Sequence, residues 1–97
     1  MMKNNNIIFI AQYKNKNIRL TEKQWNHIIF RHPIMVNKIN QIIETIESPT
    51  VIKKQTYGIL KFYKHFKSIN GYIMVAVKIL NDEGFVATSY VTRKIGE

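Results

Sequence analysis

The stretch LTEKQWNHIIFRHP, residues 20–33, constrains the fold most strongly, because it contains the start, the apolar face and the end of one helix. Thr21 and Gln24 have the spacing of a capping box, in which the hydroxyl accepts one free backbone N–H and the glutamine reaches back to another. Pro33 predicts the end of the helix, since the residue before a proline is pushed out of the helical conformation. The apolar residues recur at i, i+3 and i+4, as on the buried face of a helix: Trp25, Ile28 and Ile29.

The C-terminal part of this predicted helix gathers titratable and cationic side chains. His27 and Arg31 share one stripe with Gln24, at i, i+3 and i+7, and His32 follows immediately before the proline. Two histidines and an arginine are therefore expected within about one helical turn of one another. A purely structural interpretation stays open, because the helix dipole favours a cation at this end by ~0.3–1 kcal/mol.

Apolar and turn patterns along the chain predict one domain over residues 1–97, with a loose polar tip at residues 1–6. A second helix is expected over residues 34–47, where isoleucines recur with helical spacing until Ser48-Pro49. Strands are expected at residues 7–13, 18–20, 50–55, 59–66, 72–80 and 85–92, the third of them short enough to be only a lead-in. A hairpin, two helices and an antiparallel meander in this order predict an α+β domain with its helices on one sheet face.

Alternation in the later strands predicts which side chains share a face of the sheet. The face that points away from the apolar side chains is expected to carry Lys61, Tyr63, His65, Met74, Ala76 and Lys78. In the last strand, one face is expected to carry Val86, Thr88, Tyr90 and Thr92. Each polar residue among them is also an ordinary strand or surface residue, so a structural interpretation stays open for these positions too.

The formal net charge of +9, from 15 Lys and Arg residues against 6 Asp and Glu, is the strongest bulk signal in this chain. A basic field attracts phosphate backbones, so a nucleic acid is the expected partner. Most of the positive charge is lysine, however, and an AT-rich genome would produce the same bias without a function. The chain has no cysteine, no apolar run of about 20 residues and no convincing signal peptide, so we expect a cytoplasmic protein that does not span a membrane.

The sequence contains no metal-binding motif, glycine-rich phosphate loop or cysteine nucleophile, and its few carboxylates lie on a predicted helix face or turn. Two-metal phosphoryl chemistry needs clustered carboxylates, so the sequence argues against that class. RNA carries its own nucleophile, the 2′-OH, and cleavage then needs a proton acceptor, a proton donor and cations, without any cofactor. Histidine suits the proton transfers because its ordinary pKa is about 6.5. The side chains that offer these groups are His27, Arg31, His32, Lys61, Tyr63, His65, Lys78, Thr88 and Tyr90.

The motifs WNHI, RHP, SPT and GFVATSYVT resemble a set of small domains from phages, mobile elements and prokaryotic genomes, over residues 18–92. That set is placed in the superfamily of barnase, EndoU, the colicin tRNases and RelE-type toxins (BECR). The resemblance implies two helices on a four-stranded antiparallel sheet, and metal-independent RNA cleavage. The positions that match, and that the resemblance implies to be catalytic, are His27, Arg31, His32, Thr88 and Tyr90. Ile34 stands where the pattern has an acidic residue, and Ser89 where it has alanine.

These features lead to one main hypothesis, a metal-independent endoribonuclease of toxin-like type, with RNA as its partner and an antitoxin or immunity protein as a second one. His32 or His27 would exchange protons, Tyr90 would position or protonate, and Arg31 and Lys78 would hold the phosphate. Further contacts with RNA are assigned to Lys61, Tyr63, His65 and Lys78. The alternatives are a non-catalytic RNA- or DNA-binding module on the same fold and a phage or mobile-element accessory protein that binds other proteins. The oligomeric state does not follow from the sequence.

Overall fold

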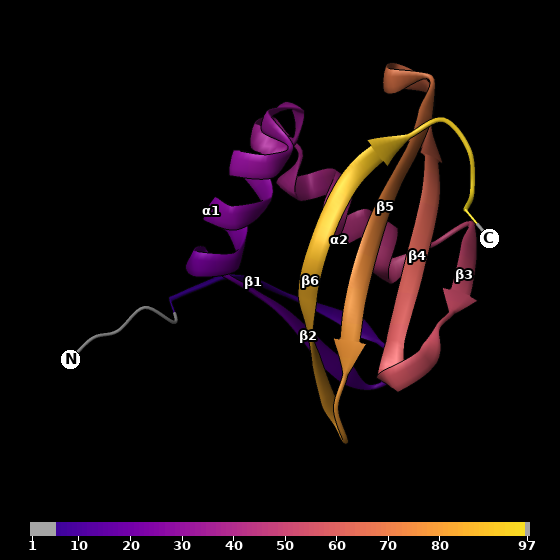
Figure 1. The fold of residues 1–97 in the computed structure, drawn as a ribbon. Helices are drawn as coiled ribbons and strands as arrows, with labels where there is room; N and C mark the ends of the chain where they lie inside the picture. Colours follow the sequence, from indigo (N-terminus) through magenta and orange to yellow (C-terminus); the bar gives the residue numbers. More distant parts are fainter. Residues whose placement is uncertain (1–5, 97) are drawn as a thin grey trace.

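Six strands form one mixed sheet with the order β1-β2-β6-β5-β4-β3 in the computed structural model, which describes residues 6–96 (Figure 1). The strands are β1 (Ile7–Tyr13), β2 (Lys16–Thr21), β3 (Val51–Lys54), β4 (Ile59–Phe66), β5 (Gly71–Ile79) and β6 (Glu83–Thr92). The helices are α1 (Glu22–Arg31) and α2 (Ile39–Glu47), with short 3-10 turns at η1 (Pro33–Asn37), η2 (Thr56–Gly58) and η3 (Lys67–Ile69). The predicted loose tip lies outside the described residues, apart from Asn6.

The predicted α+β class is confirmed, but the predicted four-stranded antiparallel sheet is wrong. At one edge β3 pairs with β4, so the supposed lead-in is a fourth strand beside the three-stranded meander of β4, β5 and β6. At the other edge β2 pairs in parallel with β6, from Asn17 opposite Glu83 to Arg19 opposite Phe85, which makes the sheet mixed. The physical reason is burial: Ala11, Ile18 and Leu20 of the N-terminal hairpin are removed from water only when the hairpin continues the sheet over the shared core.

The main core lies between the sheet and α2, with α1 closing one side. Figure 1 shows α2 behind the sheet, whereas α1 lies beside β6 at the end where β6 has separated from β2. The fully buried members come from the hairpin, both helices, η1 and strands β4 and β5: Ala11, Ile18, Leu20, Ile28, Met35, Ile42, Ile46, Phe62, Ile73, Val75 and Val77. A smaller cluster of Tyr63, Met74 and Ala76 lies on the opposite face.

Helix α1 begins as predicted at its hydroxyl cap but not at its glutamine. The Thr21 side chain accepts the backbone N–H of Gln24 at 3.2 Å, which confirms half of the capping box. The Gln24 amide instead donates to the carbonyl oxygen of Ala87 in β6, so this side chain ties the helix to the sheet. The backbone N–H of Glu22 is taken by the carbonyl of Asn6.

The second predicted helix, residues 34–47, is divided. Residues Pro33–Asn37 form η1, Lys38 leaves the helical conformation with φ −120° and ψ 24°, and α2 starts only at Ile39. Met35 of η1 has no exposed surface, and it packs in the same core as Ile42 and Ile46 of α2. The predicted isoleucine stripe of α2 packs on the core as expected.

A β-bulge in β6 overturns the predicted alternation of that strand. Val77 faces Val86, but Ala76 faces Thr88, so Ala87 is an extra residue in the ladder. Val86 therefore points into the main core, while Thr88 and the residues at two-residue intervals after it point to the opposite face. Val86 and Thr88 were predicted to share a face, and the bulge separates them.

Gly84 of β6 lies between β2 and β5, and its replacement tests how closely these three strands pack. A Cβ at this position would lie 2.8 Å from the carbonyl oxygen of Lys78 and 2.9 Å from Cδ1 of Ile18. We expect Gly84→Ala to lower the free energy of unfolding by about 1–3 kcal/mol, because backbone and a buried side chain must both move. Denaturant unfolding measures this change, and a variant as stable as the wild type would argue against close packing of β2, β5 and β6 here.

Candidate functional site

The sheet face opposite α2, which we call the open face, carries most of the predicted site residues in cross-strand rows. Residues paired across β4, β5 and β6 lie side by side on the same face of the sheet. The rows on the open face are His65–Tyr72–Thr92, Tyr63–Met74–Tyr90, Lys61–Ala76–Thr88 and Ile59–Lys78–Phe85. Lys53 of β3 extends the third row beside Lys61. The predicted face of β4 and β5 therefore agrees with the register, and the bulge places Thr88 and Tyr90 on the same face.

His32 reaches the edge of this face and contacts Tyr90. The centroids of the two rings are 5.3 Å apart, with 48° between the ring planes. The backbone of His32 is fixed on both sides, because its N–H donates to Ile28 at 2.7 Å and its carbonyl accepts from Met35 at 2.9 Å. The junction of α1 and η1 thus holds a half-buried imidazole against the sheet. Residues 58 positions apart in sequence meet at this point.

His27 and Arg31 lie on the polar stripe of α1 that begins with Gln24. Because the Gln24 amide reaches β6, this stripe runs along the β6 side of the helix. Both side chains are exposed, and His27 lies more than one turn before the junction that carries His32. Arg31 directly precedes His32, so the arginine remains near the candidate site, whereas His27 belongs to the exposed surface of the helix.

A pocket of about 280 Å³ opens on the open face beside Tyr90. One wall consists of sheet residues, and the other consists of the chain after β6, residues 93–96, which we call the strap. Figure 1 shows the strap turning over the ends of β5 and β4 toward β3. The residues that line this strap pocket are Lys61, Tyr63, Tyr90, Thr92, Lys94, Ile95 and Gly96. Three predicted residues, Lys61, Tyr63 and Tyr90, therefore line one pocket.

The strap is anchored on Tyr63, which is 2% exposed. The N–H of Gly96 donates to the Tyr63 hydroxyl at 3.3 Å, and Ile95 packs on the small cluster that contains Tyr63. A Cβ at position 96 would lie 3.1 Å from the same hydroxyl, so the backbone approaches the ring closely. Tyr63 therefore shapes the pocket and presents little surface to a ligand.

Lys78 lies away from the junction of His32 and Tyr90, and His65 is not among the residues that line the strap pocket. Lys78 is four residues along β5 from Met74, about 13 Å at the usual strand rise, and its ammonium donates to the carbonyl of Tyr57. His65 lies on β4 in the row next to that of Tyr90, and its ring meets Tyr72 edge-on at 5.2 Å. The structure thus groups Lys61, and not Lys78, with Tyr90.

The charges around the open face favour a polyanion. The described carboxylates lie on the helices and in the β5–β6 hairpin: Glu22, Glu44, Glu47, Asp82 and Glu83. Glu83 is ion-paired with Arg19 at 2.5 Å, and Glu47 accepts the backbone N–H of Gln12 at 2.9 Å. Among residues 6–96, no carboxylate lines the strap pocket, which has two lysines in its walls. The named carboxylates therefore do not neutralise the lysines of the strap pocket, which can attract phosphate groups.

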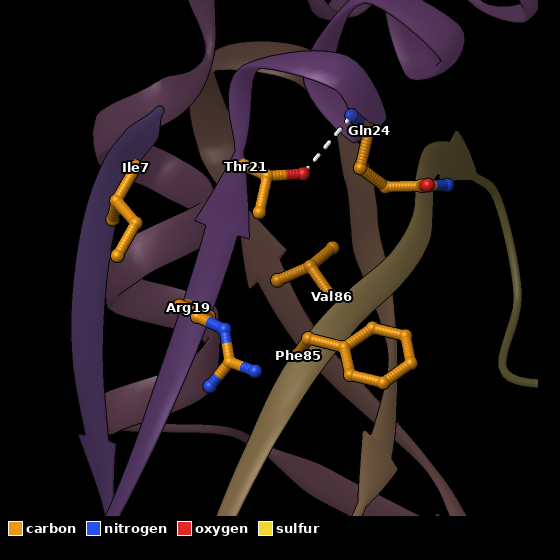
Figure 2. A pocket seen from close by; sticks show the side chains of 6 residues that line it. All are labelled: Ile7, Arg19, Thr21, Gln24, Phe85 and Val86. Carbon is orange, nitrogen blue, oxygen red and sulfur yellow. Dashed lines mark hydrogen bonds between the residues drawn. The ribbon is translucent and has the colours of Figure 1, made fainter. Parts of the chain in front are cut away.

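A larger hollow of about 390 Å³ lies where β2 and β6 separate and α1 begins. Figure 2 shows its lining, in which Arg19 and Phe85 lie on neighbouring strands and Gln24 extends from the helix. Its cation, Arg19, is already paired with Glu83, and the other walls include Ile7 and Val86. The described part of its lining contains no histidine, tyrosine or lysine, so these side chains offer no group for proton transfer.

Within residues 6–96, no three His, Cys, Asp or Glu side chains come together as a metal site. In the same part of the chain, no helix is long and apolar enough to cross a membrane. The fold and site together define an α+β domain with a cationic, tyrosine-bearing sheet face edged by a histidine. No family model, curated protein or solved structure matches this chain.

Sequence reasoning missed the contribution of the strap. The segment RKIGE reads as a polar tail, yet Lys94, Ile95 and Gly96 form a wall of the pocket. A signal exists in Ile95, a single apolar residue among polar ones directly after a strand, because such a residue is buried only if the chain turns back onto the sheet.

Proposed function

We propose that this protein is a metal-independent endoribonuclease whose site is the junction of His32, Tyr90 and the strap pocket. The observation that supports the proposal most is the ring contact between His32 and Tyr90 at 5.3 Å, at the edge of a lysine-bearing face. Histidine is the side chain that exchanges protons most readily near neutral pH. It lies here next to the phenol of Tyr90, whose hydroxyl can serve as a second proton-exchanging group. The resemblance of residues 18–92 to BECR domains points in the same direction.

The proposed reaction is an internal transfer on the RNA. The 2′-OH loses its proton, its oxygen bonds to the adjacent phosphorus, and the bond from phosphorus to the 5′ oxygen breaks. The leaving oxygen takes a proton, so the products are a 2′,3′-cyclic phosphate and a 5′-OH. His32 carries out proton transfer, and Tyr90 positions the imidazole and the phosphate or supplies the second proton. No redox step or cofactor is involved.

Cations supply the remaining part of the reaction, which is stabilisation of the charge on the five-coordinate phosphate. Lys61 lies in the row next to Tyr90 and lines the same pocket. Arg31 is exposed and directly precedes His32, so its guanidinium can contact a phosphate that reaches the junction. We assign phosphate binding to Lys61 and Arg31 in place of Lys78, which is engaged with Tyr57.

The proposal includes a cytoplasmic, toxin-like role, in which RNA is the target and an antitoxin or immunity protein covers the open face. The strongly basic charge supports RNA as the partner, and an acidic inhibitor would satisfy the same cations. Masking of the open face by such a partner would block the pocket and the histidine at once.

Incubation of the purified protein with RNA in EDTA tests the proposal. We expect cleavage of an RNA oligonucleotide but not of the same sequence with 2′-deoxyribose, because the nucleophile is the 2′-OH. Gel electrophoresis of end-labelled strands measures both reactions. An intact RNA after long incubation would contradict the proposal, and so would cleavage of both strands or cleavage that EDTA abolishes.

A non-catalytic RNA-binding module is the second candidate, and one residue favours it. Ile34 stands where the resembling domains have an acidic residue, and it is 57% exposed at the start of η1, two residues from His32. An isoleucine cannot orient or charge-balance a neighbouring imidazole as a carboxylate does. This candidate predicts salt-dependent binding of RNA without any product.

A further inference from the structure

The strap has its own fixed conformation before any ligand binds. The Thr92 hydroxyl donates to the carbonyl of Lys94 at 3.1 Å, and the guanidinium of Arg93 donates to the carbonyl of Asn70 in the β4–β5 turn at 3.4 Å. With the anchor of Gly96 on Tyr63, these bonds hold the strap at its start, middle and end. A wall that is already ordered loses little conformational freedom when a ligand enters.

The strap pocket has the chemistry of a phosphate site with an aromatic side. Lys61 of β4 and Lys94 of the strap both line the pocket, together with the hydroxyl-bearing residues Tyr90 and Thr92 of β6. The volume of about 280 Å³ lies at the lower end of the range for small-molecule sites, so it suits one nucleotide unit and not a longer segment.

We propose that the strap pocket binds one unpaired nucleotide of the RNA, with its phosphate between Lys61 and Lys94 and its base or ribose against Tyr90. The inference rests on the proposed function and adds its substrate class, which is single-stranded RNA. Tyr90 belongs both to the pocket and to the contact with His32, so a nucleotide held in the pocket places its neighbouring phosphate at the histidine.

The strap makes this site selective for unpaired RNA. A nucleotide in a duplex is stacked and paired, and its base cannot turn into a pocket that is closed on one side by protein. Nucleotides of a single strand can be splayed apart and placed against aromatic side chains, which contribute about 1–3 kcal/mol per base. Lys94 is thus a specificity-determining residue, in addition to the cations of the sheet.

Binding of a strand that cannot be cleaved tests the inference separately from catalysis. The probe is a labelled 2′-O-methyl single strand, compared with a 2′-O-methyl hairpin of equal length, with affinity measured by fluorescence anisotropy. The two variants are Lys94→Ala and, as a matched control with the same loss of charge, Lys23→Ala on the exposed surface of α1. Both are exposed lysines, so the fold is expected to survive either change.

We expect the wild type to bind the single strand at least about tenfold more tightly than the hairpin, and Lys94→Ala to lose about tenfold for the single strand. For Lys94→Ala, the slope of the logarithm of the binding constant against the logarithm of the salt concentration should become shallower by about 0.7, which corresponds to the loss of one phosphate contact. For Lys23→Ala, both the affinity and this slope should stay close to those of the wild type. Equal binding of both probes, equal losses in both variants or no binding at all would overturn the inference. The protein could bind the 2′-O-methyl single strand selectively and yet leave the RNA strand of the same sequence uncleaved. That result would overturn only the nuclease proposal.

Discussion

Replacement of His32 by alanine is expected to lower the rate of RNA cleavage in EDTA by at least about 100-fold. The imidazole is the only histidine ring in contact with Tyr90 among residues 6–96, and its removal leaves no comparable proton acceptor at the pocket. The rate constant for cleavage of an end-labelled RNA measures the effect under single-turnover conditions, where product release does not contribute.

The stability of the same variant separates chemistry from folding. His32 is half-buried and ends α1, so we expect its loss to cost at most about 1 kcal/mol of folding free energy. His27→Ala serves as the comparison, because it removes an exposed histidine from the same helix. If His27→Ala loses activity while His32→Ala retains it, the assignment of proton transfer to His32 is wrong.

Replacement of Phe62 by alanine is expected to cost about 3–5 kcal/mol of folding free energy. Phe62 is fully buried in β4, and its ring meets Tyr13 of the N-terminal hairpin edge-on at 4.9 Å. The ring therefore joins the meander to the hairpin that the sequence did not assign to the sheet. A domain of this size is stable by only about 5–15 kcal/mol, so the loss is a large share of the total.

Thermal unfolding measures this effect against a matched control. Phe30→Ala makes the same chemical change at a position that is 83% exposed, and it is expected to alter stability by no more than about 0.5 kcal/mol. For Phe62→Ala the melting temperature should fall by at least about 12 °C. Similar melting temperatures for the two variants would contradict a core shared by hairpin and meander.

Local patterns were sufficient for the parts of the fold that depend on neighbours in sequence. The alternation of β4 and β5 assigned Lys61 and Tyr63 to the open face, and the register places them there. The helical spacing of Trp25 and Ile28 identified the buried side of α1. These features follow from the two- and 3.6-residue periods, which do not require knowledge of distant partners.

The features that escaped sequence reasoning depend on contacts between distant segments. The parallel pairing of β2 with β6 joins residues more than 60 positions apart, and no local pattern sets its register. The bulge at Ala87 reverses the side of Val86 without any glycine to mark it. Gln24 satisfies a carbonyl of β6 instead of its own helix start, because the helix lies next to that strand.

In the candidate site, too, the features that the sequence did not predict depend on contacts between distant segments. The contact of His32 with Tyr90 was expected only through the resemblance of two motifs, and the structure supplies its geometry. Lys78 was grouped with the site because it shares a face, yet the strand rise places it about 13 Å away along β5. Lys94 was missed because burial of Ile95 depends on the turn of the chain after β6.

Identification of the termini left on cleaved RNA tests the central claim most directly. The protein is incubated with a single-stranded RNA in EDTA, and the fragments are analysed by mass spectrometry. Attack by the 2′-OH with proton transfer at His32 predicts fragments that end in a 2′,3′-cyclic phosphate and begin with a 5′-OH. Fragments that carry a 5′-phosphate and a 3′-OH, or RNA that stays intact, would contradict the account.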